Sequence, residues 1–375
     1  MQSSVPVLLL ALAAELVPIT PTAAAGCDKI IFSDVGWTDI SATTAVTSLI
    51  IEALGYETQI RVLSVPGTFA ALAADEVDVF LGNWMPSMEA DIRPYLTAGT
   101  VETVRENLAG AKFTLATNPA GAALGIRDFA DLATHSQELG SRIYGIEPGN
   151  DGNRLILEMI QSNAFGLSEF TLVESSEQGM LAEVTRSEKE NSPIVFLGWE
   201  PHPMNTSFNL TYLTGGDAYF GTNFGEASVM TVARAGYRAQ CPNIGRLLTN
   251  LVFSLRMEDE IMAAILHDGL APRWAARLWL TANPSVFEPW LAGVNSRDGG
   301  DALAAVQAAF PPILRAIPSG TNLTVTSIPQ PLPAGFAMET SGAVTGPWVL
   351  QPSTNTPVTL SIRNEGALFV RASKL

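Results

Sequence analysis

The sequence predicts an α/β protein of two lobes, each built on a doubly wound sheet. Buried-strand patterns alternate with helical patterns over residues 29–81 and again over 142–197. Two distant strands also lead into near-copies of one motif, FLGNWMPSM at 80–88 and FLGWEPHPM at 196–204. At 375 residues the chain exceeds one ordinary core and suits two domains with an additional segment.

The first part of the chain predicts a β-α-β-α-β unit with short connections. Its strands are expected at 29–33, 58–62 and 77–81, and its helices at 40–54 and 66–74. An extended stretch at 113–117 then leaves the first lobe, and a second unit repeats the order. Its strands are expected at 142–146, 170–173 and 193–197, and its helices at 126–132, 153–163 and 178–187.

After about residue 224 the chain is expected to return to the first lobe. An extended stretch at 227–232 precedes helices at 243–253, 257–268, 272–280 and 283–292. From residue 301 the chain is rich in Pro, Thr, Ser and Gly, which predicts a β-rich or loosely ordered extension without a functional account. The predicted division is a signal peptide at 1–26, lobe 1 at 27–115 and 223–300, lobe 2 at 116–222, and an extension at 301–375.

Charge and the N-terminal segment indicate the partners and the compartment. The net charge of −16 and the pI of about 4.6 argue against nucleic acid and anionic membranes, which need a basic face, and are compatible with a cationic ligand. Residues 5–25 form an apolar run that ends in small residues, as in an export signal. The run lacks a preceding Lys or Arg, Glu15 interrupts it, and it is too short to span a bilayer.

The chain has two cysteines, Cys27 and Cys241. In an oxidising compartment, an even pair favours one disulfide, which would tie the mature N-terminus to a distant part of the same domain. The alternative is a lipoprotein signal at 24–27, in which Cys27 is acylated and Cys241 is free.

Four aromatic residues fall where predicted strands end: Trp37, Trp84, Phe113 and Trp199. Ligands of open α/β sheets bind at the carboxyl ends of strands. A single Trp there often caps a core, but two in matching motifs favour two walls of one cleft. Aromatic faces suit a quaternary ammonium, which cannot donate hydrogen bonds and is attracted by ring quadrupoles.

Two polar residues beside these aromatics have two interpretations each. Asp39 could supply a counter-charge to a cation or could cap the helix expected from residue 40. Asn150 could cap the helix that follows it or could bind a ligand hydroxyl. The start of that helix, at 149–152, could instead hold a ligand carboxylate through free backbone N–H groups.

The stretches FSDVGWTDI, FLGNWMPSM, GAKFTLAT, GIEPGNDGN and FLGWEPHPM resemble the substrate-binding proteins of ABC importers for choline and glycine betaine. The resemblance covers about residues 27–300 and implies a type II periplasmic-binding-protein fold, whose lobes close on the ligand. It implies a cation cage of Trp37, Trp84 and Trp199, with Phe113 where the family has Tyr. It also implies that Asp39 and Asn150 contact the hydroxyl end of choline, that the two cysteines pair, and that an ABC permease receives the ligand.

Choline is expected over glycine betaine because Asp39 would repel a ligand carboxylate. Glycine betaine, carnitine and a sulfonium analogue remain alternatives, as does a ligand-sensing module in place of a transport component. An enzyme is disfavoured, because the chain has no G-x-S-x-G elbow and no phosphate-binding glycine loop. The three histidines show no metal-ligand spacing, and His202 is expected to be a loop residue. The prediction is therefore a periplasmic monomer without cofactor, metal or catalytic site.

Overall fold

The structure, a computed structural model, describes residues 26–319, 322–330, 336–341, 349–350, 358–361 and 369–374. The predicted signal peptide, apart from Gly26, and parts of the predicted extension lie outside these residues. Among the residues described, no helix is both long and apolar enough to cross a membrane.

One mixed sheet runs through the main body, in the order β2-β1-β3-β9-β4-β7-β5-β6, with β8 paired to β4. The pairs β1–β2, β1–β3, β5–β6 and β5–β7 are parallel, whereas β9 and β4 run antiparallel to their neighbours. The strands are β1 (Lys29–Asp34), β2 (Glu57–Val62), β3 (Val79–Met85), β4 (Val101–Thr117), β5 (Arg142–Tyr144), β6 (Thr171–Val173), β7 (Val195–Glu200), β8 (Thr211–Tyr212) and β9 (Glu226–Arg234).

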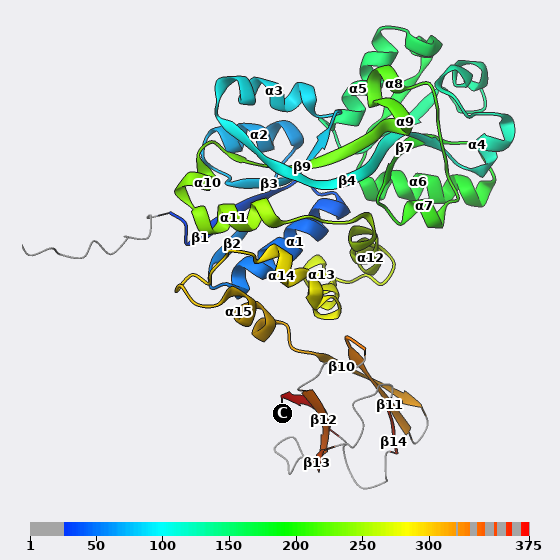
Figure 1. Cartoon of the computed structure of the whole chain (residues 1–375). Helices are drawn as coiled ribbons and strands as arrows, with labels where there is room; N and C mark the ends of the chain where they lie inside the picture. The colour runs from blue at the N-terminus through cyan, green and yellow to red at the C-terminus, as the bar shows by residue number, and fades with distance from the viewer. Residues whose placement is uncertain are drawn as a thin grey trace, which may run out of the picture.

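Strand β4 joins two halves of this sheet. Its residues 101–112 pair with β9 and its residues 112–117 pair with β7. We call β2, β1, β3 and β9 the first half-sheet, and β7, β5 and β6 the second half-sheet. Figure 1 shows β4 and β9 crossing the molecule between the two groups of helices that surround these half-sheets. The sequence predicted only 113–117 of β4, because the part before it mixes apolar with charged residues and is half exposed.

Helix α1 is the central helix of the first half-sheet, and it is buried along most of its length. Helices α12 and α13 pack against it, so these late helices lie beside the first half-sheet. Helix α3 was not predicted, because Pro94 lies inside it and only Ile92 is buried. The helices on this side are α1 (Thr38–Ala53), α2 (Val65–Ala73), α3 (Glu89–Ala98), α10 (Tyr237–Gln240), α11 (Pro242–Asn250), α12 (Leu255–Leu266), α13 (Pro272–Ala282), α14 (Phe287–Trp290) and α15 (Ala302–Ala309).

The second half-sheet is covered by shorter helices and by α5 and α6, which were both predicted to within a few residues. The helix expected at 126–132 is instead a short 3₁₀ turn, Phe129–Asp131, in which Asp128 and Asp131 form a capping box. The helices on this side are α4 (Pro119–Leu124), α5 (Asp151–Gln161), α6 (Glu177–Glu190), α7 (Met204–Ser207), α8 (Asp217–Phe220) and α9 (Thr222–Gly225).

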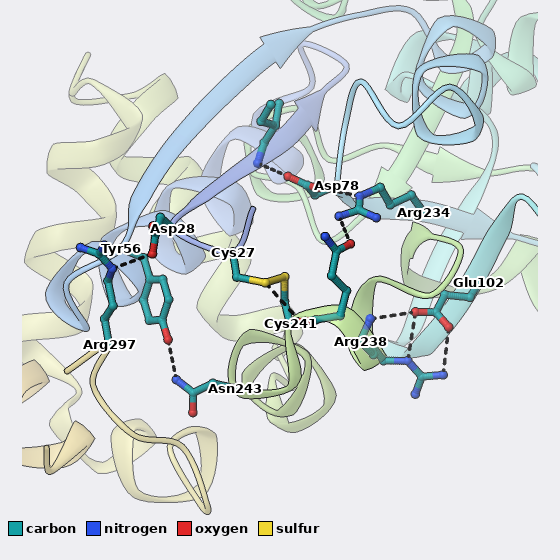
Figure 2. Close-up of a disulfide and its surroundings, with 12 residues drawn as sticks. Cys27, Asp28, Tyr56, Asp78, Glu102, Arg234, Arg238, Cys241, Asn243 and Arg297 are labelled. Carbon is teal, nitrogen blue, oxygen red and sulfur yellow. Dashed lines mark hydrogen bonds and ion pairs between the residues drawn. A yellow bond between two sulfur atoms is a disulfide. The ribbon is translucent and has the colours of Figure 1, made fainter. Parts of the chain in front are cut away.

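A disulfide joins Cys27 to Cys241, at the start of α11 (Figure 2). The link confirms the predicted pair and ties the beginning of the described chain to a residue 214 positions later. Around it, Arg234 pairs with Asp78 at 2.7 Å, which fixes β9 against the loop before β3. A sulfur that forms a disulfide cannot also carry the thioether of a lipid anchor.

Beyond α15, the described residues form two three-stranded antiparallel sheets (Figure 1). The orders are β10-β11-β14 and β13-β12-β15. For these residues the β-rich alternative is confirmed. The strands are β10 (Ile313–Ser319), β11 (Asn322–Ile328), β12 (Phe336–Ser341), β13 (Val349–Leu350), β14 (Val358–Ser361) and β15 (Phe369–Lys374).

Candidate functional site

The two repeated motifs place a Trp at the same position of two strands. Trp84 is the second-to-last residue of β3, and Trp199 is the second-to-last residue of β7. Each strand is apolar and buried along its length, and a cis peptide bond to proline follows each one. Both indole side chains are buried, with 4% of their surface exposed. The structure thus confirms that a buried strand delivers each Trp.

Phe113 lies between these two tryptophans. It sits on β4 directly opposite Trp199 of β7, as the strand register requires. Its ring centroid lies 6.5 Å from that of Trp199 and 6.1 Å from that of Trp84, and both pairs are inclined rather than stacked. Phe220 packs against Phe113 at 5.9 Å. The rings of Trp84, Phe113 and Trp199 therefore form a continuous aromatic wall, with one ring each from β3, β4 and β7.

Trp37 contributes from the loop between β1 and α1. It occupies the position before the first turn of α1, with extended backbone angles. Its indole Nε1 donates a hydrogen bond of 2.8 Å to Glu147 Oε1, in the loop that leads from β5 to α5. Burial raises the pKa of the Glu147 carboxyl to about 7. This bond joins Trp37, which lies beside the first half-sheet, to Glu147, which lies beside the second half-sheet.

Asp39 lies in the first turn of α1 and does not cap the helix. Its Oδ2 accepts a hydrogen bond of 3.2 Å from Trp84 Nε1, while Oδ1 has no hydrogen-bond partner among the described residues. The capping interpretation of Asp39 is therefore wrong. The side chain is 1% exposed, and burial, with the negative charge of nearby Glu177, raises the pKa of its carboxyl to about 8.

Asn150 and Asp151 form the N-terminus of α5. Asn150 Oδ1 accepts hydrogen bonds from the backbone N–H groups of Gly152 (2.8 Å) and Asn153 (3.2 Å), so the capping interpretation of Asn150 is confirmed. Its Nδ2 donates to Asp151 Oδ1 at 3.2 Å. Both side chains are 1% exposed. Burial raises the pKa of the Asp151 carboxyl to about 6.

These side chains line one pocket with about 260 Å³ of empty space, part of which is open to solvent. All six residues that the sequence singled out for ligand binding line it, although 162 positions separate the first from the last. Two further residues complete the wall, Ile146 and Asp151, which the sequence did not indicate. The lining consists of Trp37, Asp39, Trp84, Phe113, Ile146, Asn150, Asp151 and Trp199.

Glu177, at the start of α6, connects the back of the cavity to α1. Its Oε2 accepts from the backbone N–H of Thr38 at 2.8 Å, and its Oε1 lies 3.1 Å from His202 Nε2. His202 Nδ1 accepts from the backbone N–H of Met204, so the ring carries its proton on Nε2 and donates to Glu177. His202 is 1% exposed and its ring centroid lies 4.8 Å from that of Trp199. His202 thus holds Trp199 from behind rather than lining the cavity.

Another charged group near the site is paired with a neighbouring side chain. Glu200, which follows Trp199, pairs with Lys112 at 2.7 Å on the neighbouring strand. In the part of the chain that the structure describes, no three His, Cys, Asp or Glu side chains lie close enough to hold a metal. The cavity instead combines apolar ring faces with carboxylates, an environment in which a desolvated organic cation is stabilised.

Comparison with known proteins identifies a family. Residues 28–282 match the model of the substrate-binding domain of ABC-type glycine betaine transport systems. The match spans more than half of the chain and ends before α15 and the strands that follow it.

Two solved structures are 63% identical to the chain. An ABC-transporter choline-binding protein in complex with choline superposes with a TM-score of 0.75, covering 76% of this chain and 98% of that one. An ABC-transporter choline-binding protein in an unliganded semi-closed conformation superposes with a TM-score of 0.71, covering 76% and 99%. The chain is also 47% identical over 138 residues to the uncharacterized protein ORF1 of Chromohalobacter salexigens, an alignment that covers 37% of this chain and 88% of that protein.

Proposed function

The chain belongs to the family of substrate-binding domains of ABC-type glycine betaine transport systems, and from that membership we propose that it binds choline. The family is defined by binding a solute for transport, which is not an enzymatic activity. In this proposal the chain captures the ligand in the cavity between the half-sheets and delivers it to a membrane permease. The chemistry of the cavity supports choline as the ligand in particular.

The observation that carries the proposal is an aromatic wall beside a buried carboxylate. The ring of Phe113 lies 6.1 Å from that of Trp84 and 6.5 Å from that of Trp199, and Asp39 accepts a hydrogen bond from Trp84. A trimethylammonium group has no N–H to donate, so a protein can hold it only by shape, ring faces and charge. Each desolvated aromatic face contributes on the order of 1 kcal/mol to such a cation. We propose that Trp37, Trp84, Phe113 and Trp199 enclose the ammonium group.

The polar end of the ligand distinguishes choline from glycine betaine. The backbone N–H groups of Gly152 and Asn153 already donate to Asn150, so the start of α5 has little to offer a ligand carboxylate. One carboxyl oxygen of Asp39 has no hydrogen-bond partner among the described residues, and a bound cation favours the ionised form of this group, which accepts from a hydroxyl and opposes a ligand carboxylate. In our proposal Asp39 and Asn150 contact the choline hydroxyl. Glycine betaine is the second candidate because of the family to which the chain belongs.

Release and capture require the cavity to open. We propose that the chain forms two lobes. One consists of residues 27–115 and 223–300 and the other of residues 116–222, and the lobes rotate relative to each other about β4 and β9. Two hydrogen bonds then hold the closed form, one from Trp37 to Glu147 and one from Thr38 to Glu177. The chain would be exported by its signal at 1–26 and act as a periplasmic monomer. Alternatively, the closed, ligand-bound form signals to a membrane partner, and the chain is then a ligand sensor rather than a transport component.

Calorimetric titration of the mature protein with choline and with glycine betaine tests the proposal. Tight choline binding with glycine betaine at least about tenfold weaker is expected, a difference of about 1.4 kcal/mol. Preference for glycine betaine would overturn the assignment of choline. Uptake in a deletion strain separates the two uses: loss of choline uptake indicates transport, whereas intact uptake with altered gene expression or chemotaxis indicates sensing.

A further inference from the structure

An ion pair joins α5 to α3 outside the ligand cavity. Arg154 Nη2 donates to Asp91 Oδ2 at 2.9 Å and to the backbone carbonyl oxygen of Ser87 at 2.8 Å. Arg154 belongs to proposed lobe 2, whereas Ser87 and Asp91 belong to proposed lobe 1. None of the three residues lines the cavity. They therefore connect the two proposed lobes without forming part of the ligand site.

The contact also holds the segment that carries Trp84. Ser87 follows Trp84 by three residues, in the turn between β3 and α3. The backbone N–H of Met88 donates to the Trp84 carbonyl oxygen at 2.9 Å, so the chain folds back on Trp84 at this point. Because Arg154 bonds to the Ser87 carbonyl oxygen, it fixes this turn against α5. Loss of the contact would leave Trp84 freer to move away from α5.

The ion pair is more exposed to solvent than the contact between Thr38 and Glu177. The side chains of Arg154 and Asp91 are 31% and 16% exposed. Thr38 and Glu177, which join the proposed lobes at the start of α1, are 4% and 1% exposed. Salt screens exposed charges more strongly than buried ones, and the Debye length falls from about 10 Å at 0.1 M to about 3 Å at 1 M. Of these two contacts, salt should therefore weaken the ion pair more.

The arginine is held in position by its own helix. Arg154 Nη1 donates to Glu158 Oε1 at 3.2 Å, one turn further along α5. This pair directs the guanidinium toward α3, so less side-chain freedom is lost when the proposed lobes meet. An isolated surface ion pair contributes little to stability because two long side chains must be ordered. Here one of them is already ordered, and the guanidinium bonds to a carboxylate and a carbonyl oxygen together.

We propose that Arg154 and Asp91 form a salt-sensitive latch on the closed cavity, which sets how fast the ligand is released. The inference rests on the solute-binding function and the lobe closure proposed above, but not on the identity of the ligand. At low ionic strength the latch holds the turn after Trp84 against α5, and release is slow. At high ionic strength the charges are screened, the lobes separate more often, and release is faster.

The test measures ligand release by stopped-flow tryptophan fluorescence at about 0.05 M and about 1 M NaCl, with choline and with glycine betaine. The parent protein should release its ligand about threefold faster at the higher salt concentration. Salt also slows the association of choline with a protein of net charge −16, so the release rate is compared and not the affinity.

Three variants remove the latch: Asp91→Asn, Arg154→Gln and the double variant. At low salt each single variant should release the ligand about threefold faster than the parent or more, and the salt dependence should be lost. The double variant should be no faster than the faster single variant, because both changes remove one interaction. Asp91→Ser removes the same carboxylate and replaces Asp91→Asn if thermal unfolding shows that this variant is poorly folded.

Glu158→Gln is the matched control. Glu158 pairs with the same guanidinium, but from within α5, so its removal leaves the contact between the proposed lobes in place. This variant should keep the salt dependence of the parent. Release that is independent of salt in the parent would overturn the latch, as would an unchanged salt dependence in Asp91→Asn and Asp91→Ser.

The outcomes separate the latch from the proposed function. If glycine betaine binds and choline does not, the choline assignment fails and the latch is tested on glycine betaine. If neither ligand binds, the solute-binding function fails, and small-angle X-ray scattering of the ligand-free protein tests the latch alone. The parent should then expand between low and high salt while Asp91→Asn does not. Identical scattering of the parent at both salt concentrations would overturn the latch in that case.

Discussion

The backbone N–H of Thr38 donates a hydrogen bond of 2.8 Å to Glu177 Oε2, across 139 residues of chain. Thr38 begins α1 beside the first half-sheet, and Glu177 begins α6 beside the second. The Thr38 hydroxyl also donates to Glu177 Oε1, at 2.5 Å. The first N–H groups of a helix have no partner within the helix and attract negative charge. The carboxylate that caps α1 is therefore supplied by the opposite side of the ligand cavity.

Removing this cap should make the closed form less stable. For Glu177→Ala we expect choline to dissociate about tenfold faster, because a hydrogen bond to a charged group contributes about 1.5–3 kcal/mol. Stopped-flow measurement of ligand release, followed by tryptophan fluorescence, gives the rate. Thr38→Val, which leaves His202 paired with Glu177, should act in the same direction with a smaller effect.

Glu183→Ala is the matched control for this prediction. Glu183 lies on the same helix, α6, and pairs with Arg186 at the surface. Its removal should leave the release rate unchanged. An unchanged rate in Glu177→Ala would mean that the contact does not limit opening of the cavity.

Choline binding should strengthen as the pH rises. Burial raises the pKa of Asp39 from 3.8 to about 8 in the empty cavity, and a bound cation favours its ionised form. Binding therefore releases a proton in the pH range between the lowered pKa of Asp39 in the complex and about 8, and affinity rises by up to about tenfold per pH unit within that range. Calorimetry in buffers of different ionisation enthalpy measures the released proton. In Asp39→Asn the dependence should flatten, and a steep dependence in that variant would contradict the assignment to Asp39.

The same pKa shift predicts the stability of the ligand-free protein. The folded state holds the Asp39 proton more tightly than the unfolded state does, because the folded pKa is the higher one. The free energy of unfolding should therefore fall as the pH rises from about 4 to about 8. Ligand-induced stabilisation should grow over the same range, which thermal unfolding with and without choline measures.

Trp199→Ala should weaken choline binding about tenfold or more, on the scale of one desolvated cation–π contact. The side chain forms one wall of the cavity and packs against Phe113. Trp274→Ala is the matched control, because Trp274 is 47% exposed and lies on α13, away from the cavity lining. Equal affinities for Trp199→Ala and Trp274→Ala would remove Trp199 from the cage.

Gly152→Ala should reduce both stability and affinity, although Ala normally stabilises a helix by about 0.5–1 kcal/mol over Gly. A Cβ atom at Gly152 would lie 2.5 Å from Phe113 Cζ and 3.0 Å from each Leu197 methyl group. The added methyl group therefore displaces the Phe113 ring toward the ligand space. Thermal unfolding and choline titration check both effects. A higher melting temperature with unchanged affinity would show that Phe113 is not held against α5.

Much of the aromatic site could be predicted from the sequence because its residues repeat a recognisable context. Trp84 and Trp199 each lie near the end of a buried strand, two residues before a proline, and the carboxyl ends of strands meet at one edge. Asp39 and Asn150 lie within stretches that resemble one family. The sequence left open whether Asn150 caps α5 or is free to bind a ligand, and its hydrogen bonds to the backbone show that it caps the helix.

The residues that the sequence missed act through long-range contacts. Asp151 lies in the stretch GIEPGNDGN, but an Asp at a helix start is common because of the helix dipole alone, so its type and position did not show that it is buried in the cavity. Glu147 and Glu177 are acidic residues in polar stretches, and their partners Trp37 and Thr38 lie more than 100 positions away. Nothing short-range in the sequence distinguishes them from solvated surface acids.

The cavity is proposed to recognise the positive charge of its ligand, through aromatic ring faces and carboxylates, and not only the ligand's shape. The most direct measurement is calorimetric titration with choline and with its uncharged isostere, in which a quaternary carbon replaces the quaternary nitrogen. The two ligands share size and hydroxyl group. Choline should bind at least about a hundredfold tighter than the isostere, since several cation–π contacts and the attraction to Asp39 are lost together in the isostere. Affinities within about threefold of each other would contradict it, because the cavity would then recognise only volume and the hydroxyl.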